Sequence, residues 1–342
     1  MSEPRLSMGE HKVYVIAEIG VNHNGSLQRA KECIDQAVAC GADAVKFQTF
    51  KSEKLVTKQA VKAKYQTEHT DATESQLNML RQLELSFEEF IALKQYCEDK
   101  DIDFLSTPFD EESAEFLNRI EVTAFKIGSG DMNNLPFLAC INQFEKPVIL
   151  STGMANLEEV EASLGMFTKS DVALLHCTSD YPASLEDVNL LAMKTMMDRF
   201  GKVTGYSDHT DGIEITIAAV AMGARIIEKH FTLDRTLPGP DHKASLEPQA
   251  FKQMVQAIRN VEQALGDGVK RCMPSEENTK LVARKSIVMA CRKSAGDVLT
   301  QQDIAVKRPG TGIEPKYYFE LIGRQLLHDV EEEQLLQWSD LK

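Results

Sequence analysis

The chain has 342 residues, of which 43% are hydrophobic and 26% are charged, a balance typical of a globular protein. Its net charge of -14 argues against a nucleic-acid surface, because affinity for phosphate backbones comes chiefly from clustered Lys and Arg. No apolar run approaches the roughly 18 residues that span a bilayer, and the N-terminus lacks the pattern of a signal peptide. We therefore expect a cytoplasmic protein without a membrane segment. Its seven cysteines are an odd number and show no paired C-x-x-C spacing, so we expect them to be reduced thiols.

Short apolar runs alternate with amphipathic stretches along most of the chain. We expect strands at 13–20, 44–50, 103–109, 124–130, 147–153, 172–179, 203–208 and 224–231. Helix signals lie between them: Ser26 and Gly41 bracket one helix, and Ser86 with Glu89 forms a capping box before another. Asn156 and Glu159 form a second box. Eight such alternations over about 250 residues predict an α/β fold, the (β/α)₈ barrel.

One interval departs from this rhythm, a polar insertion from Lys51 to about Glu84. Long insertions in compact domains usually act as lids or binding loops, and a disordered excursion is the alternative. Past Gly266, where the last barrel helix ends, the composition changes. We expect a barrel domain over 1–268, a linker over 269–282 and a small β-rich domain over 283–342 with two short strands.

Polar residues stand where each predicted strand ends, and in a barrel this end forms the active-site mouth. They are Glu18, Lys46, Gln48, Ser106, Thr107, Lys126, Ser129, Ser151, Thr152, His176, Thr178, Ser207, His209, Glu228 and His230. Any one of them alone is equally well explained as a capping or hydrogen-bonded core group, but polar ends on all eight strands predict a site. Because side chains alternate along a strand, Glu228 and His230 share the inward face, and Lys229 faces the helices.

Two kinds of ligand are suggested by these residues. Lys46 and Lys126 lie beside a Gly-Ser-Gly stretch that starts at residue 128, which suits a phosphate or carboxylate. His209 and His230 end neighbouring strands and predict a clamp for a divalent metal such as Mn²⁺, with hydrogen bonding to substrate as the alternative. Barrel lysines also form Schiff bases, so Lys126 or Lys229 leaves a lyase open.

The motifs, taken together, resemble the sialic acid synthases over nearly the whole chain. They include "AEIGVNHNG" (17–25), "KIGSGD" (126–131), "GYSDHT" (205–210), "EKHFTLD" (228–234) and "KRPGTGI" (307–313). These synthases condense phosphoenolpyruvate with N-acetylmannosamine or a related amino sugar. The resemblance implies a barrel followed by an antifreeze-like (SAF) domain, and a homodimer in which each SAF domain is swapped onto the other subunit's barrel mouth.

The resemblance also implies roles for individual residues. The phosphoenolpyruvate group would be Lys46, Thr107, Lys126, Ser129, Ser151 and Ser207, and the metal ligands would be His209 and His230, holding Mn²⁺ or else Mg²⁺ or Co²⁺. The amino sugar would contact Gln48, Tyr181, Glu228, Asp241 and, from the swapped domain, Arg308. Glu18 would serve as the base for the water that attacks C2. Asp131 stands where these synthases more often have Glu and is left out of the site.

Several functions remain open at this point. N-acetylneuraminate synthase is the first expectation, and the insertion resembles the sialic and legionaminic branches of the family more than the pseudaminic branch. The alternative is legionaminic acid synthase, which uses 2,4-diacetamido-2,4,6-trideoxymannose with the same chemistry. More remote are a Schiff-base sugar-acid lyase and a non-catalytic binding protein.

Overall fold

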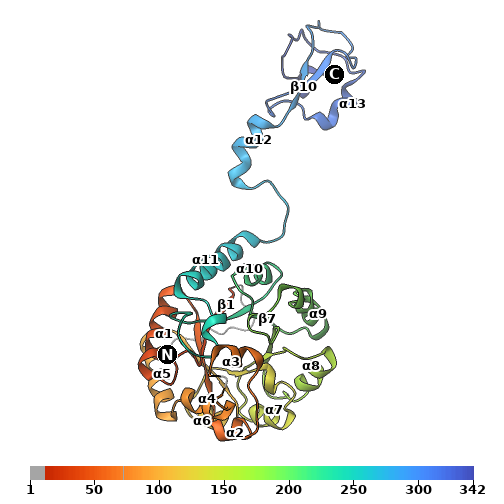
Figure 1. Ribbon diagram of the computed structural model, residues 1–342. Helices are drawn as coiled ribbons and strands as arrows, with labels where there is room; N and C mark the ends of the chain where they lie inside the picture. The colour runs from red at the N-terminus through yellow and green to blue at the C-terminus, as the bar shows by residue number, and fades with distance from the viewer. Residues whose placement is uncertain (1–11, 72) are drawn as a thin grey trace. The chain divides into compact units, whose positions relative to one another are not determined.

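The barrel predicted from the sequence is present in the computed structural model, which describes residues 12–71 and 73–342 (Figure 1). Its strands are β1 Tyr14–Gly20, β2 Ala44–Thr49, β3 Asp103–Pro108, β4 Phe125–Ile127, β5 Val148–Ser151, β6 Val172–His176, β7 Thr204–Asp208 and β8 Ile226–His230. They pair in parallel in the order β3-β2-β1-β8-β7-β6-β5-β4. Because β3 and β4, the ends of this order, also contact each other, the barrel is nearly closed.

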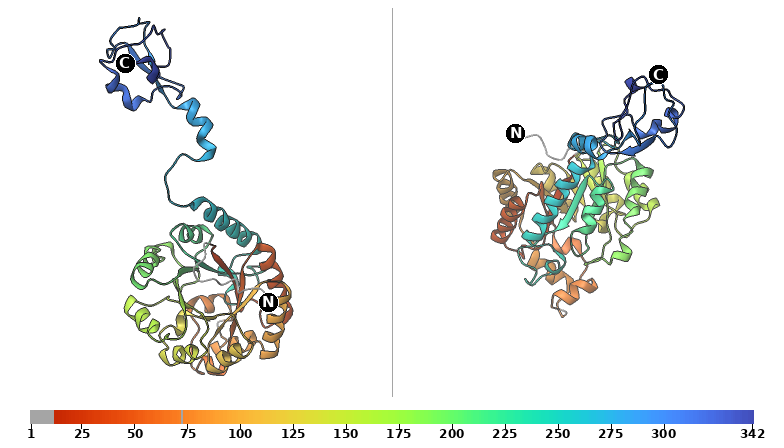
Figure 2. Two further views of the ribbon diagram at one scale, coloured as in Figure 1. Left: turned by 180° about the vertical axis from the view of Figure 1, so that it is seen from behind. Right: turned by 90° about the horizontal axis from the view of Figure 1, so that it is seen from above.

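A ring of helices surrounds the strands, as Figure 1 and the left-hand view of Figure 2 show. They are α1 Leu27–Cys40, α5 Phe87–Asp99, α6 Glu111–Arg119, α7 Leu135–Asn142, α8 Leu157–Leu164, α9 Leu191–Phe200, α10 Glu214–Ala221 and α11 Pro248–Leu265. The predicted caps are confirmed: the Ser26 hydroxyl accepts from the Arg29 amide, and Gly41 ends α1 with a φ of 84°. The Ser86–Glu89 box precedes α5 and the Asn156–Glu159 box precedes α8.

The strands have an apolar and a polar half inside the barrel. Near their amino ends the inward side chains form an apolar cluster that includes Ile16, Ala44, Ala124 and Ile226. Two residues after each of these four, the same inward face carries an ionisable group: Glu18, Lys46, Lys126 and Glu228. Since strand side chains alternate with period two, the floor of the barrel is apolar and packed, and its carboxyl end carries ionisable side chains.

The insertion after β2 contains three short helices, α2 Ser52–Leu55, α3 Lys64–His69 and α4 Gln76–Leu83. It lies in front of the strands in Figure 1 and projects from one end of the barrel in the right-hand view of Figure 2. The prediction of an ordered lid or binding segment therefore fits the structure better than that of a disordered excursion.

The chain divides into two compact units, with the second running from Asp267 to Lys342. In this unit β9 Ser286–Met289 pairs antiparallel with β10 Ile304–Lys307, and α13 Tyr318–Leu321 adds to a separate apolar core. Helix α12 Glu277–Ala283 takes up the second half of the expected linker and the first residue of the expected domain. It forms because Pro274 and the acidic residues after it favour a helix start. Among the described residues, no helix is long and apolar enough to cross a membrane.

Candidate active site

A cavity of about 480 Å³ lies at the carboxyl ends of the barrel strands. It brings together every barrel residue for which the resemblance implied a role: Glu18, Lys46, Gln48, Thr107, Lys126, Ser129, Ser151, Tyr181, Ser207, His209, Glu228, His230 and Asp241. These side chains come from strands β1 to β8 and the loops that follow them. The barrel topology thus gathers residues that are more than 200 positions apart in the chain.

Four of the polar residues at strand ends turn away from this cavity and are satisfied structural groups instead. The hydroxyls of Ser106 and Thr49 lie 2.7 Å apart, and the Thr152 hydroxyl donates to the Leu175 carbonyl at 2.9 Å. His176 and Thr178 bond the carbonyls of the loop after β6 at 2.7 and 3.1 Å. The expectation that all of the polar strand ends line the mouth was wrong for these four.

Two lysines and two glutamates form the charged centre of the cavity. Lys46 Nζ lies 2.7 Å from Glu18 Oε2 and donates to the Thr107 hydroxyl at 3.0 Å. Glu228 lies between the lysines, with its carboxylate oxygens 3.9 Å from Lys46 Nζ and 3.5 Å from Lys126 Nζ. All four side chains are buried, so their charges interact strongly.

The two glutamates differ in acidity although they occupy neighbouring strands. Burial raises the pKa of Glu18 to about 7, against the attraction of Lys46 and with the help of repulsion from Glu228. Burial acts on Glu228 as well, but Lys126 and Lys46 together outweigh it and lower its pKa to about 2. Glu228 therefore stays ionised, while Glu18 can exchange a proton near neutral pH.

The side of the cavity next to Lys126 is lined with hydroxyl groups. Lys126 Nζ donates to the Ser151 hydroxyl at 2.6 Å, and the Ser207 hydroxyl donates to Glu228 at 2.9 Å. The Ser129 hydroxyl accepts from the Gly153 amide at 3.0 Å. A Cβ at Gly153 would lie 2.8 Å from that hydroxyl, so this close approach requires glycine. Two ammonium groups beside several hydroxyls can bind a phosphate or carboxylate.

The two histidines lie side by side at the mouth, at the ends of the adjacent strands β7 and β8, with ring centroids 5.4 Å apart. His209 Nδ1 bonds the Thr178 carbonyl at 2.6 Å and must donate to it, which leaves Nε2 with its lone pair. His230 Nδ1 is buried and has no hydrogen-bond partner among the described residues; the nearest carboxylate oxygen, of Asp241, is 4.0 Å away. Burial lowers the pKa of both rings, so both are neutral imidazoles.

These features fit a metal ion, because neutral imidazole is the form that binds one and a buried unpartnered ring nitrogen is otherwise costly. In the part of the chain that the structure describes, no group of three or more His, Cys, Asp or Glu side chains is placed to hold a metal. An ion at His209 and His230 would therefore take its other ligands from water and substrate.

The remaining predicted sugar contacts border this centre. Gln48 donates to Glu18 Oε1 at 3.1 Å, and the Tyr181 ring lies 4.2 Å from that of His209. Burial raises the pKa of Asp241 to about 6. Arg308 lies in the second unit, directly after β10, and its role stays a prediction.

The prediction from sequence missed the lining contributed by the insertion. Tyr65, Gln66 and Gln76 all border the cavity, and the Tyr65 ring lies 4.9 Å from that of Tyr181. The only signal was an aromatic residue in an otherwise polar stretch, "KAKYQ" (62–66). Cys177 was missed as well, and its thiol contacts the Ser129 hydroxyl at 3.1 Å.

Comparison with known proteins matches both units. The NeuB family model matches residues 33–270, and the SAF domain model matches residues 284–342. N,N'-diacetyllegionaminic acid synthase of Campylobacter jejuni subsp. jejuni is 45% identical, over 95% of this chain and 99% of that protein. The synthase of the same name from Legionella pneumophila is 43% identical, over 96% and 94% of the two chains.

A solved structure of similar fold has a related name. N-acetylneuraminic acid (sialic acid) synthetase of Leptospira borgpetersenii, crystallised in complex with citrate, is 36% identical, with a TM-score of 0.72. The match covers 82% of this chain and 94% of that one.

Proposed function

The chain belongs to the NeuB family, and from that membership we propose that it condenses phosphoenolpyruvate, 2,4-diacetamido-2,4,6-trideoxymannose and water to N,N'-diacetyllegionaminic acid and phosphate. It is an enzyme of this family of synthases, whose transferase-type reaction joins the three carbons of phosphoenolpyruvate to a sugar. N-acetylmannosamine, which the sequence alone placed first, becomes the second candidate. The relatives at 45% and 43% identity are both named legionaminic acid synthases, which favours the diacetamido sugar.

The observation that carries the proposal is the pair of buried lysines in the cavity. Lys46 and Lys126 stand among the hydroxyls of Thr107, Ser129 and Ser151, and their ion-pair partners are Glu18 and Glu228. A phosphate and a carboxylate on one small substrate would be neutralised by two such ammonium groups. Phosphoenolpyruvate has both groups, and the lysines would hold its C3 carbon against the sugar carbonyl.

His209 and His230 would hold a divalent ion, for which Mn²⁺ is our proposal and Mg²⁺ or Co²⁺ the alternatives. Such an ion supplies Lewis-acid polarisation of the sugar aldehyde. The protein contributes the orientation of the His209 ring, because the Thr178 carbonyl binds its Nδ1 and directs Nε2 into the cavity. It also keeps both imidazoles neutral through burial.

Glu18 is the proposed base. When C3 of phosphoenolpyruvate forms a bond to C1 of the sugar, C2 becomes electron-poor and water adds there. Glu18, with its pKa raised by burial to about 7, takes the proton from that water. The sugar C1 oxygen takes up a proton and becomes a hydroxyl. The tetrahedral intermediate then loses the proton of its C2 hydroxyl and expels phosphate to leave the 2-keto acid, while Lys46 and Lys126 stabilise the departing charge.

The antifreeze-like unit completes the proposal. We place Arg308 at the acyl group of the sugar in a domain-swapped homodimer, as the resemblance implies. Mixing an Arg308→Ala chain with a chain inactivated at Glu18 tests this. Recovery of part of the activity is expected if sites are shared between subunits, and no recovery would contradict the swap.

The direct test is phosphate release from phosphoenolpyruvate with each sugar in turn. We expect a higher kcat/KM with the diacetamido sugar, loss of activity in EDTA and recovery with Mn²⁺. A higher kcat/KM with N-acetylmannosamine would refute the substrate, and full activity in EDTA would refute the metal. Borohydride added with pyruvate would trap a lysine adduct in a Schiff-base lyase, and we expect none.

A further inference from the structure

The insertion between β2 and α5 supplies one wall of the active-site cavity. Its apolar contribution is Leu55, Val56, Met79, Leu80 and Leu83. These side chains belong to a small hydrophobic cluster that is separate from the barrel core. The cavity therefore changes from ionic at the strand ends to apolar at this wall, where the described residues of the insertion contribute no charged side chain to the lining.

The polar part of the wall lies on α3 and at the start of α4. Tyr65 packs on Tyr181 at 4.9 Å between ring centroids, and Tyr181 in turn packs on His209 at 4.2 Å. This places α3 next to the histidine pair. Gln66 and Gln76 add amide groups to the lining.

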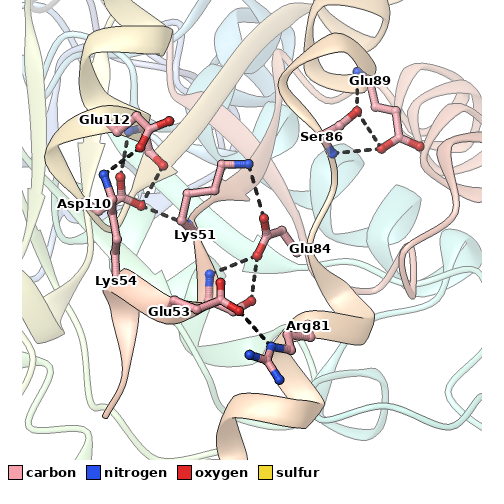
Figure 3. Close-up of polar contacts among 11 residues, drawn as sticks. Lys51, Glu53, Lys54, Arg81, Glu84, Ser86, Glu89, Asp110 and Glu112 are labelled. Atoms are coloured by element: carbon pink, nitrogen blue, oxygen red, sulfur yellow. Dashed lines mark hydrogen bonds and ion pairs between the residues drawn. The ribbon is translucent and has the colours of Figure 1, made fainter. Parts of the chain in front are cut away.

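The two ends of the insertion are tied together at its base, as Figure 3 shows. Glu84 accepts hydrogen bonds from the Ser52 amide at 2.9 Å and the Ser52 hydroxyl at 2.7 Å, and its other oxygen lies 3.2 Å from Lys51 Nζ. The Lys51 amide donates to Asp110 at 2.9 Å, which anchors this base to the start of α6. One carboxylate with three partners thus limits how far the wall can move.

A second support comes from the loop after β1. Gly25 has a φ of +68°, and a Cβ at this position would come within 2.4 Å of the Gln82 carbonyl on α4. The loop therefore packs directly against the backbone of the insertion and requires glycine there. His69, on α3, also lies 3.4 Å from the Pro240 carbonyl in the loop that carries Asp241.

The reaction fixes which end of the sugar lies at the strand ends. The aldehyde carbon must lie by the lysines and histidines at the strand ends, so an extended open-chain sugar directs its C4 to C6 atoms away from them. In N-acetylmannosamine these carbons carry only hydroxyls. In the 2,4-diacetamido-2,4,6-trideoxy sugar, C4 carries an acetamido group and C6 is a methyl.

We propose that the insertion wall is the element that selects the sugar, with the C6 methyl against Leu55, Val56 and Met79 and the C4 acetamido group by Gln66 and Gln76. This inference rests on the proposed function. A C6 hydroxyl at the apolar part would lose its water without gaining a partner, which costs free energy. Discrimination of this kind between a methyl and a polar substituent in an apolar pocket is worth roughly 10- to 200-fold in kcat/KM.

The test is the double variant Leu55→Asn/Val56→Thr, which makes the wall polar at two half-buried positions. Its measure is the ratio of kcat/KM for the diacetamido sugar to that for N-acetylmannosamine, and we expect a fall of at least about 10-fold. The KM for phosphoenolpyruvate should not change, because the lysines are untouched. The matched control is Val61→Thr, in the same insertion but 85% exposed and away from the lining, which should keep the wild-type ratio.

The outcomes separate this inference from the function on which it rests. An unchanged ratio in the folded double variant overturns the selective wall, whichever sugar the wild type prefers. A wild-type preference for N-acetylmannosamine refutes the proposed substrate, even if the double variant shifts the ratio. If circular dichroism shows that the double variant does not fold, Met79→Gln, which has nearly the same volume, tests the same ratio with the same expectations.

Discussion

The buried ion pair between Lys229 and Asp208 offers the sharpest test of the barrel's construction. Lys229 Nζ lies 2.9 Å from Asp208 Oδ2 and donates to the Thr210 carbonyl at 2.6 Å, and both charged side chains are fully buried. The pair sits behind the two histidines, since each residue directly precedes one of them on β7 or β8. We therefore choose Lys229→Met, which removes the cation and keeps most of the side-chain volume.

The expected cost follows from what Asp208 retains. Breaking a buried ion pair by removing one partner costs about 3–5 kcal/mol. Asp208 keeps three donors, the Thr210 amide at 2.9 Å, the Thr210 hydroxyl at 2.8 Å and the Thr216 hydroxyl at 2.6 Å. We therefore expect the lower end, about 3 kcal/mol, or a fall of roughly 6–12 °C in the unfolding midpoint of the barrel.

Far-ultraviolet circular dichroism during heating measures this midpoint, because the barrel holds most of the helices. Trp338, the chain's only tryptophan, lies in the second unit, so its fluorescence transition should not shift. In the double variant Lys229→Met/Asp208→Asn neither full charge remains, and we expect less destabilisation than the sum of the single changes. A barrel midpoint within about 2 °C of wild type for Lys229→Met would refute the reasoning.

Three further predictions concern the cavity. Because burial raises the pKa of Glu18 to about 7, the basic form of Glu18 is lost as pH falls through that value, and the wild-type kcat/KM should fall below about pH 7. The Glu18→Gln variant should be slow and should lack this pH dependence. A wild-type rate that does not depend on pH would contradict the role of Glu18 as the base. His230→Ala should lose Mn²⁺ binding in calorimetry at an unchanged unfolding midpoint; retained binding would contradict the metal assignment. Lys126→Met should raise the KM for phosphoenolpyruvate by about 100-fold, because the substrate anion would lose a buried cationic partner. Sugar binding should not change. An unchanged KM for phosphoenolpyruvate would show that Lys126 is not part of the anion site.

The residues at the strand ends were predictable because their orientation follows from a local rule. Period-two alternation directed Glu228 and His230 inward and Lys229 toward the helices, and the structure places all three that way. The same rule could not say which polar groups already have partners. Thr152 and His176 end strands as the site residues do, yet both bond backbone carbonyls outside the cavity.

The insertion shows the opposite case. Its helices α3 and α4 have no repeat that relates them to the barrel, so the sequence could not say where they fold. Their place depends on long-range contacts, such as that of Gly25 with the Gln82 carbonyl and that of Tyr65 with Tyr181. Each of these contacts joins segments that are far apart in the chain.

The barrel, the caps of its helices and the inward-facing set of lysines, glutamates and histidines could thus be predicted from the chain, because alternation and capping depend on neighbours in the sequence. The acidity of those groups, in contrast, depends on contacts between strands. Glu18 and Glu228 both point inward from the neighbouring strands β1 and β8, but one has a pKa of about 7 and the other of about 2. The physical reason is distance: Glu228 lies within 4 Å of both lysines, whereas the only lysine salt bridge of Glu18 within the described residues is with Lys46.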